Sequence, residues 1–327
     1  MGRLSVGGRE AVARSECALL ALLAVMTLLA TSSCRETREL PACVESAPPR
    51  GPTLETLGDP VVVGAGDIAE PDPVGAEATA KLLDGIDGHV VTFGDNAYVN
   101  ATLENFLESY GSTWGRHRWR TRPAVGNHEY HSPHAGPYFA YFCDAAGAPF
   151  KGYYSYDVGA WHFVVLNSQC AADDGYGGGP ACDASSEQAR WLRADLAAHP
   201  SRCTAAYWHH PRFSSGSHGD HAAMRDLWKV LSDANADVVL SGHDHDYERF
   251  APMDSDGVAD TERGMRQFVV GTGGAKLYSF NPPHANSEVR VVDEWGVIKL
   301  TLHADSFDWE FINVDRVVRD SGGGRCH

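Results

Sequence analysis

Short apolar runs alternate with amphipathic stretches from Val61 onward. The runs "PVVVGAGD", "HVVTFGDN", "CTAAYWHHP" and "DVVLSGHDH" predict buried strands, because each is short, rich in apolar residues and closed by turn residues. The stretches "GAEATAKLLDGI", "ATLENFLESY", "SSEQARWLRADLAAHP" and "HAAMRDLWKVLSDANA" predict helices. Strands that alternate with helices indicate an α/β sandwich.

Two of the predicted helices carry further local signals. The third stretch has Ser185 followed three residues later by Gln188, which predicts a capping box. The fourth stretch places apolar side chains on one helical face: Ala223, Leu227, Val230, Leu231 and Ala234.

The alternation breaks in the middle and at the end of the chain. "YYSYDVGAWHFVVLNS" predicts a hairpin that turns through Val158, Gly159 and Ala160. "RQFVVGTGG", "WGVIKLTLH" and "FDWEFIN" predict three strands with no helix between them. We therefore expect mixed strands in two packed sheets flanked by helices. No internal repeat and no boundary follow residue 60, so residues 59–327 are expected to form one domain.

The first 34 residues have the pattern of a secretory signal peptide. Arg3, Arg9 and Arg14 precede the apolar stretch Ala18–Ala30, and small residues follow it. A membrane-spanning helix would need about 20 apolar residues, more than this stretch contains. Residues 35–58 are rich in proline, glycine and charge, which predicts a flexible tether. We therefore expect an exported protein.

The fate of the exported chain depends on Cys34. This residue resembles the lipidated cysteine of a bacterial lipoprotein, although Thr31 stands where such signals usually carry Leu. A cut after Ser32, which would free a secreted protein, is the alternative. The sequence leaves a secreted, a periplasmic and a lipid-anchored cell-surface protein open.

Cysteine usage fits an oxidising compartment. Loss of Cys17 with the signal, and use of Cys34 as an anchor, leave six cysteines: Cys43, Cys143, Cys170, Cys182, Cys203 and Cys326. An even number allows up to three disulfides. Cys170 and Cys182 flank the flexible "AADDGYGGGPA" and are the expected pair, whereas the other pairings do not follow from the sequence.

The charge of the chain narrows the range of partners. The formal net charge is −16, and no run rich in Lys or Arg occurs. This argues against nucleic acid or an anionic membrane surface as the partner, so we expect membrane contact only through the signal or a lipid anchor. An acidic surface also repels a phosphorylated substrate, so a phosphate site would need its own local positive charge.

Side chains that bind metals follow five predicted strands. In open α/β sheets, ligands bind beyond the carboxyl ends of the strands. The residues at these ends are Asp67, then Asp95 and Tyr98, Asn127 and His128, His209 and His210, and His243 and His245. In most cases a glycine lies one or two residues upstream, and we expect it to allow the sharp turn that aims the side chain.

The ligand types indicate which metals fit. Carboxylate, amide oxygen, imidazole and phenol suit a hard-to-borderline ion such as iron, manganese or zinc. The Cys₄ or Cys₂His₂ spacing of a structural zinc site is missing from the sequence. The ligands are too many for one ion, and two ions roughly 3.5–4 Å apart, bridged by one carboxylate, account for them.

These residues also resemble the sequence blocks of a known family. "GD" with Asp67, "GDNAY", "GNHE", "WHHP" and "GHDHDYER" resemble the calcineurin-like metallophosphoesterases, and among them the purple acid phosphatases of bacterial type. The similarity runs from Val61 to about Arg249, with every block in order, and extends into "RQFVVGTGG". It implies a four-layer αββα fold and a hydrolase that acts on phosphate esters.

The resemblance also implies a role for each residue. The first ion would be held by Asp67, Asp95, Tyr98 and His245, and the second by Asp95, Asn127, His209 and His243, with Asp95 as the bridge. The metal pair would be iron with iron, zinc or manganese. His128 would face the substrate and protonate the leaving group. His243 and His245 would each reach one ion, because residues i and i+2 of an extended segment point the same way.

Several positions allow more than one interpretation. Tyr98 is a ligand if its phenol ionises, which Fe³⁺ favours, and otherwise it is packed. His210 contacts the substrate or a ligand, or is packed. Arg249 anchors phosphate, neutralises an acid behind the ligands, or forms a structural salt bridge. Asp246, with Asp244 and Glu248, is expected to orient the imidazoles.

Other positions concern the first block and the rim of the cleft. The family's first block is usually Asp-x-Gly, and here Ala69 takes the place of the glycine, for which we expect only a local change of the turn. Further histidines lie in loops that can form the rim of the cleft: His131, His134, His218 and His221.

The expected function is hydrolysis of a small phosphate monoester. A phosphodiesterase or nucleotidase on the same site is the nearest alternative, since the metal ligands do not separate these activities. A surface protein that uses the fold only for binding is a further alternative. It would be marked by the loss of a ligand, and none is lost here.

Overall fold

The computed structural model describes residues 42–44, 58–170 and 178–327. The predicted signal peptide, Cys17, Cys34 and almost all of the predicted tether lie outside the described residues. Within the described part of the chain, no helix is long and apolar enough to cross a membrane.

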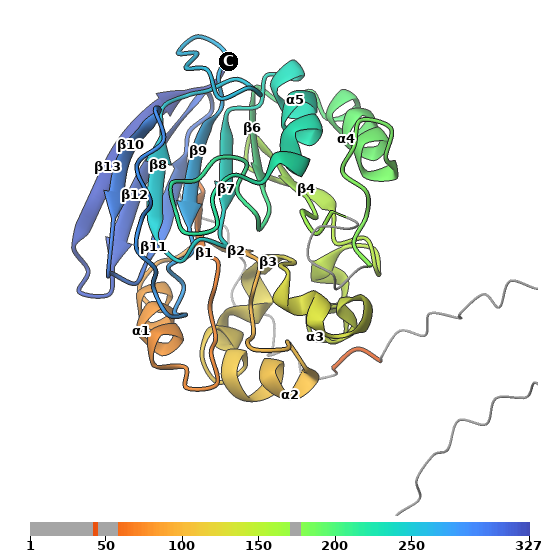
Figure 1. Cartoon of the computed structure of the whole chain (residues 1–327), viewed down its shortest axis with the longest axis vertical. Coiled ribbons are helices and arrows are strands. Elements are labelled where there is room, and N and C mark those ends of the chain that lie inside the picture. The colour runs from red at the N-terminus through yellow and green to blue at the C-terminus, as the bar shows by residue number, and fades with distance from the viewer. Residues whose placement is uncertain (1–41, 45–57, 171–177) are drawn as a thin grey trace, which may run out of the picture. The chain divides into compact units, whose positions relative to one another are not determined.

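Two mixed sheets form the centre of the folded part (Figure 1). The six-stranded sheet has the order β13-β12-β11-β1-β2-β3 and the seven-stranded sheet the order β10-β8-β9-β7-β6-β5-β4. The strands of the first sheet are β1 (Val61–Ala65), β2 (His89–Phe93), β3 (Thr121–Ala124), β11 (Gly296–Leu302), β12 (Ser306–Asn313) and β13 (Val318–Arg325). Those of the second are β4 (Tyr154–Val158), β5 (Trp161–Val165), β6 (Cys203–Tyr207), β7 (Val238–Ser241), β8 (Tyr247–Phe250), β9 (Arg266–Val270) and β10 (Ser287–Val291).

Each sheet contains a run of parallel strands. Strands β1, β2 and β3 pair in parallel at one side of the six-stranded sheet, and β5, β6, β7 and β9 pair in parallel in the seven-stranded sheet, whereas the other pairs are antiparallel. Parallel neighbours have their carboxyl ends at the same edge, so the polar residues that follow them gather there. The prediction of two mixed sheets is confirmed.

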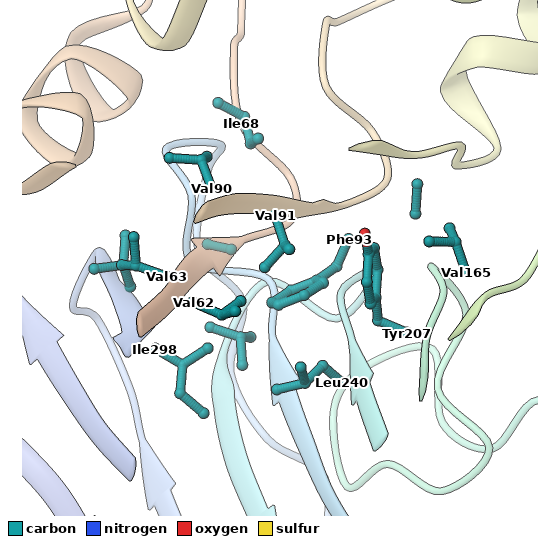
Figure 2. Packing of buried hydrophobic residues seen from close by; sticks show 14 of the residues in the cluster. Val62, Val63, Ile68, Val90, Val91, Phe93, Val165, Tyr207, Leu240 and Ile298 are labelled. Carbon is teal, nitrogen blue, oxygen red and sulfur yellow. The ribbon is translucent and has the colours of Figure 1, made fainter. Parts of the chain in front are cut away.

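The sheets pack face to face through apolar side chains. Figure 2 shows Val62, Val91 and Phe93 of the first sheet facing Tyr207 and Leu240 of the second. The rings of Phe93 and Tyr207 meet edge to face with centroids 5.8 Å apart. Alternate residues of the central strands are buried in a second cluster on the outer face, so these strands read as continuous apolar runs.

Helices cover the outer faces. Helices α4 (Glu187–Ala198) and α5 (Arg225–Asp233) pack on the seven-stranded sheet, where Leu192, Leu227 and Trp228 meet Val164 and Val239. Helix α1 (Val74–Leu83) lies beside β11 of the other sheet (Figure 1). The remaining helices, α2 (Leu103–Asn105) and α3 (Gly136–Phe142), lie in the connections around β3.

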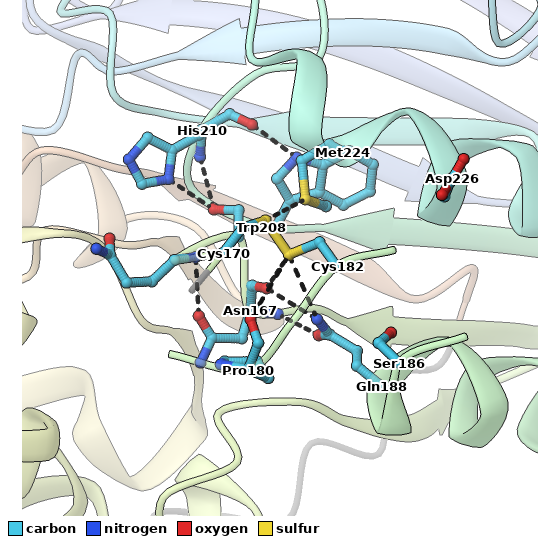
Figure 3. The surroundings of a disulfide bond; sticks show 12 residues. Asn167, Cys170, Pro180, Cys182, Ser186, Gln188, Trp208, His210, Met224 and Asp226 are labelled. Carbon is cyan, nitrogen blue, oxygen red and sulfur yellow. Dashed lines mark hydrogen bonds between the residues drawn. A yellow bond between two sulfur atoms is a disulfide. The ribbon is translucent and has the colours of Figure 1, made fainter. Parts of the chain in front are cut away.

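Three local predictions need correction. The N-cap of α4 is Ser186, not Ser185, and its Oγ accepts a hydrogen bond from the Ala189 N–H at 3.0 Å. Gln188 is fully buried and bonds the backbone of Asn167 instead of closing a capping box (Figure 3). Helix α5 ends at Asp233, so Ala234 is exposed rather than on the apolar face.

Other elements differ from the prediction in type or were missed. The predicted helix over residues 101–110 is a short α2 followed by a π-helical turn, Phe106–Tyr110. Strands β8, β10 and β13 were missed: β13 is largely exposed, β10 alternates between exposed and partly buried residues, and the buried β8 carries Glu248 and Arg249 in place of an apolar run. The hairpin is confirmed, because Val158 of β4 pairs with Trp161 of β5 across Gly159 and Ala160.

Two disulfides join described residues. The predicted Cys170–Cys182 bond is present, with Cα atoms 5.4 Å apart, and lies next to Asn167 and Gln188 (Figure 3). A second bond joins Cys203 at the start of β6 to Cys326 after β13. Cys43 and Cys143 are free thiols in this structure.

Candidate metal centre

The two sheets meet at the edge where their parallel strands end. The Gly66 N–H, just after β1, donates to the Val270 carbonyl at the end of β9 at 2.9 Å. The Gly242 N–H, just after β7, donates to the His209 carbonyl after β6 at 3.0 Å. The Asp67 N–H also donates to the Gly94 carbonyl after β2 at 3.1 Å, so backbone bonds join the loop after β1 to the next strand of its sheet and to the other sheet.

One group of side chains surrounds the Tyr98 hydroxyl. Tyr98 Oη lies 3.0 Å from Asp67 Oδ1, 3.2 Å from Asp95 Oδ2 and 3.1 Å from His245 Nε2. His245 Nε2 is also 3.2 Å from Asp67 Oδ1. The four residues to which the sequence assigns the first ion therefore present their ligand atoms to a common point.

A second group surrounds His209. Its Nε2 lies 3.2 Å from Asp95 Oδ2, 2.9 Å from Asn127 Oδ1 and 3.2 Å from His243 Nδ1. Asp95 Oδ2 is thus shared between the two groups. Asp67, Asp95 and His209 form one set that could hold a cation, and His209, His210 and His243 form another.

The outer nitrogens of two imidazoles are already engaged. His209 Nδ1 bonds the Phe93 carbonyl at 2.8 Å, and His245 Nδ1 bonds the Lys276 carbonyl at 2.6 Å. A carbonyl only accepts, so both Nδ1 atoms carry a proton and both Nε2 atoms face the carboxylates. At this spacing of about 3 Å each Nε2 atom holds either a second proton or a metal ion against the carboxylates. The donor set therefore fits bound metal.

Three of these residues adopt a backbone conformation that is rare for side-chain-bearing residues. Their φ angles are +60° for Asp67, +49° for Asp95 and +73° for His243. Left-handed φ at non-glycine residues costs free energy and concentrates at functional sites. The residues themselves make the sharp turn that we expected of the glycines before them, and that prediction is wrong for Gly66 and Gly242.

The glycines instead allow close backbone approach. A Cβ on Gly242 would lie 2.5 Å from Asp67 Oδ2, and one on Gly126 would lie 2.3 Å from Asp95 Oδ1. A side chain at either position would displace a carboxylate of the site.

The "HDH" segment is not extended. The Asp244 N–H bonds the Gly242 carbonyl at 2.9 Å, and the Asp246 N–H bonds the Asp244 carbonyl at 2.8 Å, so the segment forms tight turns. The prediction that His243 and His245 share one face of an extended strand is therefore wrong. Both imidazoles still reach the cluster, His243 through Nδ1 and His245 through Nε2.

Burial and charge shift the pKa values of the cluster. Burial alone would lower the pKa of His209, but the carboxylates of Asp95 and Asp67 raise it to about 9. Burial opposes ionisation of Asp95, yet the imidazoles of His209 and His128 hold its pKa far below the usual range. Burial, then Asp67 and Asp95, raise the pKa of Tyr98. Without a cation the phenol therefore stays protonated.

Glu129 is a supporting residue to which the sequence analysis gave no role. Its carboxylate accepts three backbone hydrogen bonds, from Gly126 at 2.6 Å, Asn96 at 2.7 Å and Asp95 at 3.1 Å. It thereby joins the loops after β2 and β3. Burial and the negative charge of Asp95 raise its pKa to about 7. Its place in the "GNHE" block was the signal that could have identified it.

His128 lies at the accessible side of the cluster. Its ring stands 4.3 Å from that of Tyr98, measured between centroids, and its Nδ1 bonds the Val99 carbonyl at 2.6 Å. Its Nε2 is 3.8 Å from Asp95 Oδ2, and the side chain is 23% exposed. The imidazole can therefore contact a ligand that enters the site.

His210 is buried beside the second group. Its ring centroid lies 4.3 Å from that of His243, and its Nδ1 lies 2.9 Å from Ser168 Oγ. A cavity of about 190 Å³ opens there, lined by Asn127, Ser168, Gln169, Cys170, His210, His221 and His243. Burial, with the nearby His209, lowers the pKa of His210 well below its usual value.

Only some of the other predicted rim residues border the site. The His218 ring lies 4.4 Å from that of His243, and the His131 ring 4.5 Å from that of His128, so both border the site. The His134 ring instead meets Phe150, with centroids 6.1 Å apart. Tyr278, which the sequence analysis missed, stacks on His245 at 4.1 Å.

Two candidate residues do not join the ligands. Arg249 forms salt bridges with Asp320, at 2.7 Å, and with Glu288, so it has the structural role that was one of its interpretations. Asp246 is buried, and neither of its carboxylate oxygens has a hydrogen-bond partner within the described ranges. The expectation that Asp246 orients an imidazole is therefore wrong.

Asp244 and Ala69 both form hydrogen bonds near the site. Asp244 contacts an imidazole, with its Oδ1 3.0 Å from His218 Nδ1. Ala69 is fully buried, and its N–H donates to the Asn96 carbonyl at 3.2 Å. With alanine in place of the family's usual glycine, the turn is therefore still bonded to the loop after β2.

The sequence matches the model of one protein family, Calcineurin-like phosphoesterase, over residues 60–247. The chain is similar to purple acid phosphatase 22 of Arabidopsis thaliana, with 33% identity over 148 residues, which are 42% of this chain and 31% of the relative. It is also similar to an uncharacterized protein of Mycobacterium tuberculosis, with 28% identity over 264 residues, which are 67% of this chain and 46% of the relative. The chain thus spans less than half the length of these curated relatives.

The fold is similar to that of a solved structure. This is the purple acid phosphatase PPD1 of yellow lupin, Lupinus luteus, with a TM-score of 0.65 and 21% identity. The match covers 81% of this chain and 53% of the lupin chain. The agreement supports the predicted architecture of two packed sheets with helices outside.

Proposed function

Because the chain belongs to the calcineurin-like phosphoesterase family, we propose that it is a metal-dependent hydrolase of phosphate monoesters. The observation that supports this most is the convergence of carboxylate, amide, phenol and imidazole ligand atoms at spacings of 2.9–3.2 Å. Such spacings suit ligands of shared ions, and the salt-bridge partners of Asp67 and Asp95 among the described residues are imidazoles.

The ligands would divide between two ions. Asp67, Asp95, Tyr98 and His245 would hold the first ion, and Asp95, Asn127, His209 and His243 would hold the second, with Asp95 shared by both. Iron paired with iron, zinc or manganese suits this set. Two ions held there supply a hydroxide nucleophile near neutral pH and positive charge beside the phosphate.

His128 acts at the leaving-group side. Its Nδ1 is fixed by the Val99 carbonyl, so Nε2 is the nitrogen left for the substrate. In the imidazolium form Nε2–H donates to the ester oxygen as the bond to phosphorus breaks. The partly exposed position of His128 suits this role, because a leaving group must depart toward solvent.

Two bound metal ions would supply the local positive charge that a phosphate needs on a protein whose net charge is −16. Imidazoles from several loops border the site and can form hydrogen bonds with the phosphate: His128, His131, His210, His218 and His221. The cavity beside His243 has a volume of only about 190 Å³. A small cavity favours a monoester with a small organic group over a diester with two.

Export is part of the same proposal. Disulfides persist in oxidising compartments, and two are present among the described cysteines. An exported protein would consist of a signal peptide over residues 1–34, a tether over 35–58 and a catalytic domain over 59–327. Lipidation of Cys34 and free secretion are both compatible with it.

An assay with two aryl substrates tests the proposal. We expect the metal-loaded protein to hydrolyse an aryl phosphate monoester at least tenfold faster than the corresponding diester. His243→Ala should abolish turnover, because a ligand is lost. His303→Ala is the matched control, since His303 bonds Asp59 and Asp308 on the surface and not the cluster. Faster turnover of the diester would show that the protein is a phosphodiesterase and not a phosphomonoesterase. A metal-loaded protein that hydrolyses neither substrate would contradict the proposed hydrolase activity.

A further inference from the structure

A second histidine and carboxylate cluster lies outside the candidate metal centre. His162 in β5, Asp195 in α4 and His199 just after α4 offer ligand atoms that all lie within 4.8 Å of one another. His162 Nε2 is 2.9 Å from Asp195 Oδ2, and His199 Nδ1 is 3.4 Å from Asp195 Oδ1. In tetrahedral zinc sites, bonds of about 2.0–2.1 Å place neighbouring ligand atoms roughly 3.3 Å apart. Both histidines lie close to this distance from Asp195, each from a different carboxylate oxygen.

The elements explain how the three side chains meet. Asp195 and His199 are four residues apart, so they lie on one face at the end of α4. That helix packs on the sheet strand that carries His162. The side chains of His162 and Asp195 are 1% and 7% exposed, whereas that of His199 is 45% exposed. An ion can therefore reach the cluster past His199.

Neighbouring side chains already orient two of the ligands. Asp157 pairs with His162 across β4 and β5, and its Oδ1 lies 2.7 Å from His162 Nδ1. This carboxylate holds a proton on Nδ1, so Nε2 is the nitrogen that faces Asp195, and a bound ion would replace the proton between them, as in carboxylate–histidine–zinc sites. The Ser155 hydroxyl donates to Asp195 Oδ1 at 2.7 Å and fixes that carboxylate.

We propose that His162, Asp195 and His199 bind a divalent transition-metal ion of the zinc class, with water as the fourth ligand. Two imidazoles and one carboxylate suit Zn²⁺ rather than Mg²⁺ or Ca²⁺, which take oxygen ligands. The His199 ring now stacks on His162, with centroids 4.7 Å apart. The His199 Nδ1–H donates to the Asp195 backbone carbonyl at 2.9 Å. Binding therefore requires the exposed His199 ring to leave this bond and to turn a nitrogen toward the ion.

The site would join α4 to the β4–β5 hairpin. His162 is at the start of β5, whereas Asn167 and Ser168 follow the end of the same strand, next to the candidate catalytic centre. Helix α4 also carries Gln188, which bonds the Asn167 backbone at 2.7 and 3.0 Å. The bound ion would therefore stabilise the helix that holds this loop, without taking part in the reaction.

Zinc binding to the full protein with its catalytic centre already loaded tests the proposal. Equilibrium dialysis against micromolar Zn²⁺, followed by metal analysis, should give one zinc per chain fewer for His199→Ala than for the wild type. The rise of the melting temperature on zinc addition should also be lost, since binding to the native state stabilises it. His303→Ala is the control, because it removes another surface histidine with two carboxylate neighbours. Equal zinc contents and equal temperature shifts in the two variants would overturn the proposal.

Asp157→Asn tests the orienting carboxylate. This residue is exposed, so the variant should fold. We expect the zinc affinity to fall by about 10–100-fold while the stoichiometry stays the same. An unchanged dissociation constant would show that Asp157 does not position His162 for the ion.

A separate observation concerns the two free cysteines. The Ala140 carbonyl accepts the Val44 N–H at 2.9 Å and the Cys143 thiol at 3.3 Å. One acceptor therefore holds the neighbour of Cys43 and the side chain of Cys143 together. Burial and the adjacent Cys43 thiol raise the pKa of Cys143 to about 11.

We infer that Cys43 and Cys143 form a third disulfide in the oxidised protein. The two thiols lose two protons and two electrons, which a protein or small-molecule disulfide accepts through thiol–disulfide exchange. The bond would fasten residues 42–44 to the end of α3.

Peptide mapping under non-reducing conditions tests this bond. We expect a linked peptide that contains both cysteines, and one additional alkylatable thiol in each of Cys43→Ser and Cys143→Ser. Cys203→Ser provides the comparison, since it should free Cys326. Complete alkylation of both Cys43 and Cys143 in the native, unreduced protein after exposure to oxidised glutathione would refute the bond.

Discussion

Single residues of the candidate metal centre bear strain that the fold has to hold in place. Asp67, Asp95 and His243 have left-handed φ angles, and Glu129 holds the loop of Asp95 through three backbone N–H groups. The residue types and their order could be predicted from the sequence. Their φ angles and the role of Glu129 could not, because both depend on contacts between loops that are distant in the sequence.

Tyr98→Phe tests the phenol as a ligand. In protein loaded with iron, we expect a tyrosinate-to-iron absorption band that disappears in the variant, because the Tyr98 oxygen is the only phenol within 3.2 Å of Asp67 and Asp95 among the described residues. Tyr110→Phe is the control, since that hydroxyl is buried away from the cluster. A band that persists in Tyr98→Phe would remove Tyr98 from the ligand set.

Glu129 should give the metal-free protein a specific pH dependence. Its pKa in the folded protein is about 7, against an ordinary value of 4.5, because burial and the charge of Asp95 disfavour the ionised form. Its contribution to stability is therefore fully present below pH 4.5 and is lost as the pH rises through 7. Urea unfolding of metal-free protein from pH 4.5 to 7 should show this fall in the wild type and a weaker one in Glu129→Gln. Parallel curves for the two proteins would contradict it.

At the scale of elements, the sequence predicted most of what positions the site. The strands that end at ligands are buried on both faces, so they appear as apolar runs whose ends are marked by polar residues. The exposed strand β13, with the sequence "VRDSGGGR", has no such pattern and forms by pairing with β12. The capping residue of α4 was misplaced by one position because Gln188 serves a buried bond to Asn167.

The two disulfides should differ in their effect on the site. Cys170 closes a loop of 12 residues and lines the cavity with Ser168, so Cys170→Ala/Cys182→Ala should lower the free energy of unfolding by about 3 kcal/mol and raise KM several-fold. The Cys203–Cys326 bond spans 123 residues. Its removal should cost about 4–5 kcal/mol and leave KM unchanged, because it lies at the amino end of β6. Equal effects on KM would contradict this division.

At the scale of the whole molecule, two features act together. The packing of two mixed sheets joins the ends of strands from both halves of the chain, which no single segment of the sequence could show. The protein has a formal net charge of −16, and its candidate metal centre is bordered by histidines. An anionic substrate must therefore approach against the mean field of the protein before it reaches the site, where bound metal ions would supply positive charge.

This charge distribution predicts a salt effect on catalysis. Salt screens the repulsion over distances of about 10 Å at 0.1 M, so kcat/KM for an aryl phosphate should rise as the ionic strength increases from about 10 to 150 mM. The diester of the same phenol carries less charge and should show a smaller rise. A fall of kcat/KM with salt would mean that the local positive field of the metal-loaded site dominates the approach.

The most direct test of the central claim is the metal content of the wild type and of Asp95→Asn, determined on the samples used for the aryl phosphate assay. Asp95 is shared by both ligand groups, with Oδ2 at 3.2 Å from Tyr98 Oη and from His209 Nε2. We predict two more ions per chain in the wild type than in the variant, together with monoester hydrolysis that only the wild type performs. Equal metal contents and equal rates would contradict a two-metal hydrolytic centre at this site.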